Sequence, residues 1–173
     1  MSLIGRKLLQ FRRPQNVSKK HKPHELNYER SKHFGLLYTW ESTAKMEAIE
    51  KLSEQLIQDQ KTVSVLCFNP LKNPIDSIHD SFGMDSLNNF GKLKSEVTER
   101  FLKSNFDYQI LLDFEFSEIT SYLTAHSNAL YKVGRSNPAF AADLDLMLEV
   151  NANADFQTYI DQILKYIKII KYD

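Results

Sequence analysis

FGLLYTWESTAKMEAIEKLSEQLIQDQKTVSVLCFNP, residues 34–70, is the stretch that decides the fold. Its first seven residues are mostly apolar or aromatic and have the length of one strand. The hydroxyl residues Ser42 and Thr43 can cap a helix, and apolar residues then recur at helical spacing over 43–59: Met46, Ile49, Leu52 and Leu56. A second apolar segment, 61–70, stops at an Asn-Pro pair. Strand, helix and strand in this order predict a βαβ unit with two parallel strands.

Strands and helices continue to alternate toward the carboxyl end of the chain. The pattern predicts helices that open at Ser95, Ser117 and Asp155, and strands over 108–114, 130–133 and 144–150. Residues 70–94 are less regular, and a short extra strand or turn fits there. About ten residues separate the last two strands, which is too few for a parallel crossover. We therefore expect these two strands to pair antiparallel or not to be neighbours.

Together these elements predict a single α/β domain over 34–173, preceded by a basic arm over 1–33. The expected architecture is a three-layer sandwich. A mainly parallel (mixed) sheet of five to six strands carries helices on both faces, in a Rossmann-like or flavodoxin-like arrangement. A chain of 173 residues buries enough surface to fold without a disulfide or a metal.

Charge is distributed unevenly along the chain. The basic arm carries nine of the 22 Lys and Arg residues but only two of the 22 Asp and Glu residues, so its net charge is +7 and that of the remainder is −7. This asymmetry points to an anionic partner. The polyanion-binding candidates lie among aromatic residues that can stack on bases, and they are Arg12, Arg13, Lys19, Lys20 and Lys22. The arm folding back on its own acidic body, or remaining a solvated tail, explains the same pattern.

The composition also indicates where in the cell the protein is located. The apolar runs are far too short to span a membrane, and the amino-terminal segment lacks the apolar core of a secretory signal. Cys67 is the only cysteine, which excludes an intrachain disulfide and a cysteine-based zinc cluster. We therefore expect a cytoplasmic location and no contact with a membrane.

Two blocks of sequence carry a resemblance to a known family. The first runs from NNFGK (88–92) through FDYQILLD (106–113), and the second from ALYKVG (129–134) through DLMLEV (145–150) into the terminal helix. With the arm leading into FGLL (34–37), they resemble an uncharacterised family of small Bacteroidetes proteins, known only as a domain of unknown function. The resemblance implies a bacterial, cytoplasmic α/β protein, and it supplies no activity, cofactor or catalytic residue.

Several candidate ligand-binding residues fall at or near predicted strand ends, where open parallel sheets bind their ligands. These crevice candidates are Trp40, Asn69, Asp113, Glu115, Gly134 and Arg135. Carboxylates that converge here, with Glu41 among them, can hold Mg²⁺ as in a phosphohydrolase or a sugar-nucleotide transferase. The same acids are equally typical of residues that precede a helix and interact with its dipole. The pattern therefore predicts no metal ligand set, and it identifies no cofactor.

No motif in the sequence identifies a catalytic reaction. Glycine-rich phosphate loops and the Gly-x-Ser-x-Gly nucleophile motif are absent, so the turn 133–137 is the best remaining anion site, although a plain connecting turn explains it more simply. Cys67 lies in an apolar strand, where a thiol is usually inert, and His126 is expected to cap a helix end. We therefore favour a non-catalytic cytoplasmic binding or accessory protein. The alternatives are a small enzyme for a phosphorylated or nucleotide ligand, and a polyanion-binding protein.

Overall fold

The computed structural model describes residues 27–86, 94–115, 117–138, 141–151 and 154–170. Within these residues six parallel strands form one sheet in the order β3-β2-β1-β4-β5-β6. The strands are β1 (His33–Thr39), β2 (Thr62–Asn69), β3 (Asp80–Gly83), β4 (Tyr108–Leu111), β5 (Tyr131–Arg135) and β6 (Leu146–Leu148). This is the strand order of the Rossmann arrangement, with β1 and β4 at its centre.

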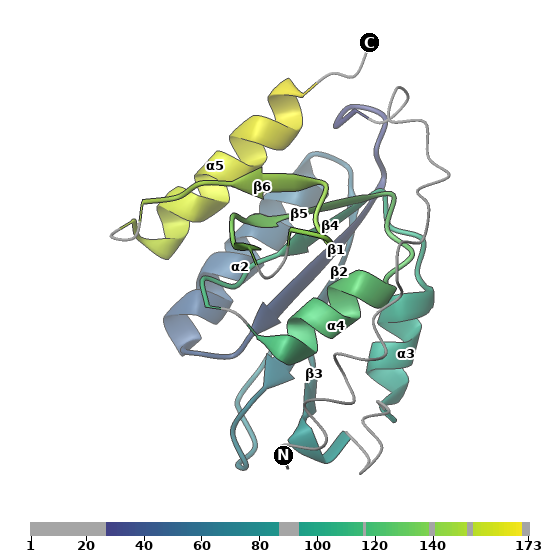
Figure 1. Ribbon diagram of the computed structural model, residues 1–173, viewed down its shortest axis with the longest axis vertical. Helices are drawn as coiled ribbons and strands as arrows, with labels where there is room; N and C mark the ends of the chain where they lie inside the picture. The colour runs from purple at the N-terminus through teal and green to yellow at the C-terminus, as the bar shows by residue number, and fades with distance from the viewer. Residues whose placement is uncertain (1–26, 87–93, 116, 139–140, 152–153, 171–173) are drawn as a thin grey trace.

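Helices cover both faces of the sheet (Figure 1). α2 (Thr43–Gln58) and α5 (Phe156–Ile169) lie on one face, and α3 (Glu96–Lys103) and α4 (Glu118–His126) lie on the other. Each pair of helices buries its apolar side chains in its own core cluster. The predicted three-layer, Rossmann-like sandwich is therefore confirmed. None of the described helices is long and apolar enough to cross a membrane.

Strand β1 alternates between the two faces, as a buried strand must. Leu36 and Tyr38 belong to the core cluster under α2 and α5, and Leu37 belongs to the cluster under α3 and α4. Gly35 interrupts this apolar run. A Cβ placed on Gly35 would lie 2.7 Å from two ring atoms of Phe106, so the aromatic ring fills the space that a side chain would need.

The last two strands contradict the expectation for them. β5 and β6 are neighbours and run parallel, with Val133 opposite Leu146 and Arg135 opposite Leu148. Because the pairing is so short, the connecting segment 136–145 has to return only about 7 Å along the strand direction. The segment can make this return without a crossover helix. The described sheet is therefore parallel throughout and not mixed.

Helix starts follow the predicted caps. Ser42, Ser117 and Asp155 each accept a hydrogen bond from the backbone N–H three residues further on. Ser95 stands before α3 as expected, but its side chain makes no capping hydrogen bond. In the described residues of 70–94, the extra elements are β3 and a 3-10 turn (Met84–Ser86).

Residues 27–32, the described part of the predicted arm before β1, pack against the body of the domain. Tyr28 is 7% exposed and belongs to the core cluster under α2 and α5. The buried Lys61 ammonium donates to the carbonyls of Tyr28 (2.7 Å) and Ser31 (2.9 Å) and lies 4.5 Å from the centre of the Tyr28 ring. Burial lowers the pKa of Lys61. Tyr28 thus anchors the chain where it enters the sheet.

Candidate functional site

A cavity of about 370 Å³ lies beyond the carboxyl ends of β1 and β4. β1 pairs with β2 on one side and with β4 on the other, so the strand order reverses at this point. Open parallel sheets bind their ligands in the crevice at such a switch point. The cavity lies between the first turn of α2 and the first turn of α5. Phe114, which follows β4 in the chain, also lines it. It is therefore the place in this fold to look for a ligand.

Asp113 ties the ends of the two central strands together below this cavity. Its side chain is almost completely buried and accepts four hydrogen bonds. Two come from Thr39, through its backbone N–H (2.7 Å) and its hydroxyl (2.8 Å), one from the Thr120 hydroxyl (2.8 Å) and one from the Lys45 ammonium (3.2 Å). A carboxylate has about four lone-pair sites, so Asp113 is saturated by the protein itself.

Lys45 supplies the positive charge of the site, and sequence reasoning missed it. Its ammonium pairs with Asp113 and with Glu41, although the Lys45 side chain is only 4% exposed. It also lies 5.3 Å from the centre of the Phe156 ring. The signal was present in the sequence: Lys45 stands four residues before Ile49, on the apolar stripe of α2. A lysine on a buried stripe requires a partner.

Apolar walls and capped helix starts complete the cavity. Ala44 and Ala48 of α2 line it, as do Phe114 and Phe156, whose rings meet edge to face with centres 5.7 Å apart. Both helices begin beside the cavity, and the side chain of each capping residue, Ser42 or Asp155, accepts from one N–H of the first turn. In Asp155 the hydrogen bond from the Thr158 backbone lowers the pKa of the carboxyl.

The other predicted crevice residues do not gather around the cavity. Asn69 is buried, and its side chain holds the loop that follows β2. It donates to the Asn73 carbonyl and accepts from the Leu71 N–H. The Trp40 backbone N–H donates to a β2 carbonyl, and its half-buried ring packs on the core. Glu115 is exposed to solvent.

Gly134 and Arg135 lie inside strand β5, not in a turn. A Cβ on Gly134 would meet Leu144 at 3.0 Å, so this glycine makes room for packing. The Arg135 guanidinium donates to the Phe114 carbonyl (3.0 Å) and lies 5.0 Å from the centre of the Phe114 ring. Arg135 therefore supports one wall of the cavity from the neighbouring strand.

The described residues contain no group of three or more His, Cys, Asp or Glu side chains arranged to hold a metal ion. Glu41 and Asp113 do approach one another at the strand ends. The Lys45 ammonium, however, lies between them and bonds to both. These two carboxylates thus already share a cation that the chain provides.

A row of hydrogen-bonded side chains runs from the core to the surface near β3. The Tyr38 hydroxyl lies 2.9 Å from His79 Nδ1, and His79 Nε2 lies 2.8 Å from the half-exposed Glu50 carboxylate. Burial raises the pKa of the Tyr38 phenol and raises that of the Cys67 thiol to about 11. The expectation that Cys67 is an inert buried thiol agrees with this environment. His126 ends α4 as expected, with Nδ1 2.8 Å from the Tyr122 carbonyl.

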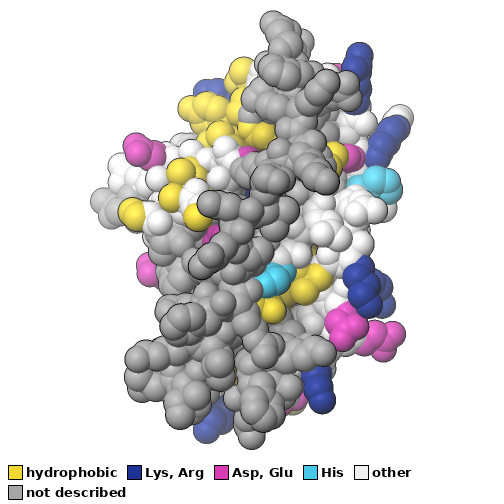
Figure 2. Space-filling view, turned by 45° about the vertical axis from the view of Figure 1, so that its right-hand side comes forward, with side chains coloured by type: hydrophobic (Ala, Val, Ile, Leu, Met, Phe, Trp, Pro, Cys, Tyr) yellow, Lys and Arg dark blue, Asp and Glu magenta, His cyan; other side chains and the backbone are white. Residues whose placement is uncertain are grey.

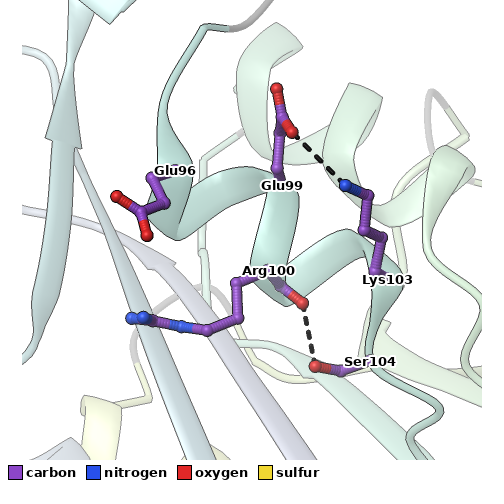
Figure 3. A pocket seen from close by; sticks show the side chains of 5 residues that line it. All are labelled: Glu96, Glu99, Arg100, Lys103 and Ser104. Carbon is purple, nitrogen blue, oxygen red and sulfur yellow. Dashed lines mark hydrogen bonds and ion pairs between the residues drawn. The ribbon is translucent and has the colours of Figure 1, made fainter.

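A shallow hollow of about 420 Å³ lies on the outer surface of α3 (Figure 3). Glu99 and Lys103 pair across one helical turn at 3.4 Å, and Arg100 pairs with Asp80 of β3. These side chains are exposed, and solvent screens such pairs strongly. Among the described side chains in Figure 2, acidic and basic groups likewise alternate without a large patch of one sign. No apolar side chain and no buried charged group of the described residues lines this hollow, so it lacks the aromatic walls and the buried lysine of the cavity at the switch point.

The polyanion-binding candidates Arg12, Arg13, Lys19, Lys20 and Lys22 lie outside the described residues.

The chain belongs to a family of unknown function, DUF6913, which matches residues 6–170. The predicted membership of an uncharacterised family is therefore confirmed, and its restriction to Bacteroidetes stays a prediction. A comparison with curated proteins found no match.

Among solved structures, the chain is similar to the glycosyl transferase family 9 protein from Veillonella parvula DSM 2008. The two share 15% sequence identity with a TM-score of 0.52, over 86% of this chain and 44% of the other. The chain thus spans less than half the length of that protein. At this level of identity the likeness shows the fold alone.

Proposed function

We propose that this protein is a non-catalytic, cytoplasmic binding protein and that its ligand lies in the cavity between the first turns of α2 and α5. The observation that carries the proposal is the saturation of Asp113 by Thr39, Lys45 and Thr120 next to a cavity at the switch point. The position is the one where this fold binds ligands. The size also fits, because ligand pockets span about 300–1,000 Å³.

The two buried charged groups at this position, Asp113 and Lys45, favour binding over catalysis. A general acid or base needs a proton that it can exchange with a substrate, and therefore a lone pair or N–H that the protein leaves open. Asp113 has no such lone pair, and two N–H bonds of Lys45 are held by carboxylates. The groups that remain accessible in the cavity are a hydroxyl, an amide, two capping or ion-paired carboxylates and two aromatic rings.

A thermal-shift screen of small metabolites, followed by calorimetry of each hit, tests this proposal. The matched variant is Ala44→Leu, because Ala44 is exposed, lines the cavity and stands in a helix where leucine is well tolerated. We expect the fold to be retained and the binding of a cavity ligand to fall by at least roughly tenfold, since leucine occupies the space. Chemical conversion of a bound compound, including hydrolysis of a nucleotide-sugar, would contradict the non-catalytic assignment.

Polyanion binding is the second candidate, and the net +7 of residues 1–33 favours it. The full chain would be titrated with single-stranded RNA at several salt concentrations. A matched variant replaces Arg12, Arg13, Lys19, Lys20 and Lys22 by glutamine. Each phosphate contact that is lost lowers the slope of log K against log salt by about 0.7 for a single strand. No binding of RNA at low salt, or equal binding by the variant, rules this function out.

A further inference from the structure

We propose that the cavity between α2 and α5 selects a cation, namely an ammonium or guanidinium group on a short aliphatic stem. This inference rests on the proposed function, because it names the class of ligand for the same cavity. Three observations carry it: the charge of the lining, its surplus of hydrogen-bond acceptors and its aromatic walls.

The lining is acidic once its internal pairs are counted. Glu41 and Asp155 contribute two carboxylates, and Lys45 contributes one ammonium. The Lys45 charge is already opposed by Asp113 from below as well as by Glu41. Even with the Arg135 guanidinium behind Phe114 included, the carboxylates outnumber the cations, so an anion entering here would meet a net negative charge. Ser42 and Asp155 also each accept from one N–H of the first turn, which leaves an anion fewer free donors at the two helix starts.

The polar groups of the cavity are mostly acceptors. Glu41 uses one carboxylate oxygen for Lys45, so its second oxygen has no hydrogen bond to a described residue. Asp155 is bonded to both the backbone N–H and the side chain of Thr158, and its carboxylate is exposed to solvent beside the cavity. The Gln157 side chain donates its N–H to Asp161, which leaves its carbonyl oxygen for a ligand. Acceptors of this kind are satisfied by a ligand that only donates. Ammonium carries three N–H donors and guanidinium five, and neither accepts.

The walls suit the rest of such a ligand. Phe156 already lies 5.3 Å from the Lys45 ammonium, a geometry in which an aromatic ring attracts a cation. Ala44 and Ala48 add a smooth apolar surface opposite, along which methylene groups of a stem can pack. A strongly hydrated anion would gain nothing from these walls.

Two sources carry this same chemistry. One is a free small amine, and the other is a lysine or arginine side chain of residues 1–26 of the chain itself. The latter segment is rich in both and is joined to an acidic body. The two sources differ in one measurable respect, because a tethered side chain competes with any free amine that is added.

Calorimetry of the full chain with 1,4-diaminobutane tests the proposal, with inorganic phosphate as the probe of opposite charge. The variant is Glu41→Gln combined with Asp155→Asn, which keeps side-chain oxygens at both positions and an N-cap residue at α5. We expect the diamine to bind and its dissociation constant to rise by at least roughly tenfold in the variant, because charged hydrogen bonds are lost. Phosphate should give no binding heat. A melting curve confirms that the variant folds.

A second full-length variant separates the two sources. In it, every lysine and arginine of residues 1–26 is replaced by glutamine: Arg6, Lys7, Arg12, Arg13, Lys19, Lys20 and Lys22. If the basic segment occupies the cavity, this variant binds the diamine more tightly than the wild type. An unchanged affinity shows that the ligand comes from outside.

The proposal is overturned if the diamine binds neither the wild type nor the glutamine variant, or if the Glu41/Asp155 substitutions leave its affinity unchanged. Tighter binding of phosphate than of diamine overturns it as well. These outcomes leave the proposed function intact when another compound binds and Ala44→Leu abolishes that binding. If no compound from the thermal-shift screen responds to Ala44→Leu, the proposed function itself fails.

Discussion

The pair Lys45–Asp113 offers the sharpest test of how the switch point is stabilised. Both side chains are buried, with exposures of 4% and 1%, and their charged atoms lie 3.2 Å apart. Removing one partner of a buried ion pair costs about 3–5 kcal/mol. The lower end applies here, because Asp113 keeps three donors after Lys45→Met, and Lys45 keeps Glu41 after Asp113→Asn. We expect each substitution to destabilise the fold by about 3 kcal/mol.

The double variant carries the decisive information. With both charges gone, no buried charge is left uncompensated, so the two changes together should cost about 2 kcal/mol less than the sum of the single costs. Urea unfolding of the four proteins, followed by circular dichroism, measures these free energies, and the m-value should stay constant. Additivity within about 0.5 kcal/mol would refute the coupling. If Asp113→Asn instead raised stability, the carboxylate would be held in an unfavourable site, as in a functional centre, and the binding assignment would need revision.

Two further predictions concern the core. Gly35→Ala should cost about 1–3 kcal/mol, because the new methyl group meets the buried ring of Phe106, whereas Gly83→Ala is the control, since the atom it meets belongs to an exposed side chain that can move. Equal melting temperatures for the two variants would contradict this packing. Cys67 should resist iodoacetamide at neutral pH until the protein is unfolded. Its pKa of about 11 in the fold lies above the ordinary value of 9.0, so the thiol stabilises the fold below pH 9. That contribution is lost as the pH rises toward 11, and in Cys67→Ala the decline in stability over this interval should be smaller.

Much of the fold was predictable from local patterns. The βαβ unit over 34–70 has apolar runs of strand length on either side of a helical stripe, and these patterns depend on neighbouring residues alone. The pairing of β5 with β6 was not predictable in the same way. The length rule for parallel crossovers assumes that the chain returns along a whole strand, whereas these two strands share three paired positions.

The candidate site was predictable in position but not in chemistry. Asp113 and Phe114 follow a buried strand, and the rule for open sheets places such residues at the switch point. The partners of Asp113 come from three other elements: Thr39 at the end of β1, Lys45 in α2 and Thr120 in α4. No local pattern links residues that lie 74 and 68 positions away. For this reason Asp113 resembled a free carboxylate in the sequence, although the protein saturates it.

The position of the Tyr28 anchor bears on what the basic arm can do. Tyr28 is fixed near the amino-terminal end of β1, and the cavity lies beyond the carboxyl end of the same strand. The strand between them is about 23 Å long, whereas 26 extended residues span up to about 85 Å, so the arm is long enough to reach the cavity. Its length therefore does not separate docking on the body from binding an external polyanion. Salt does not separate them either, because both interactions are ionic and weaken together. Competition by a small diamine does, since it displaces a basic side chain from an acidic cavity but leaves that side chain available to RNA.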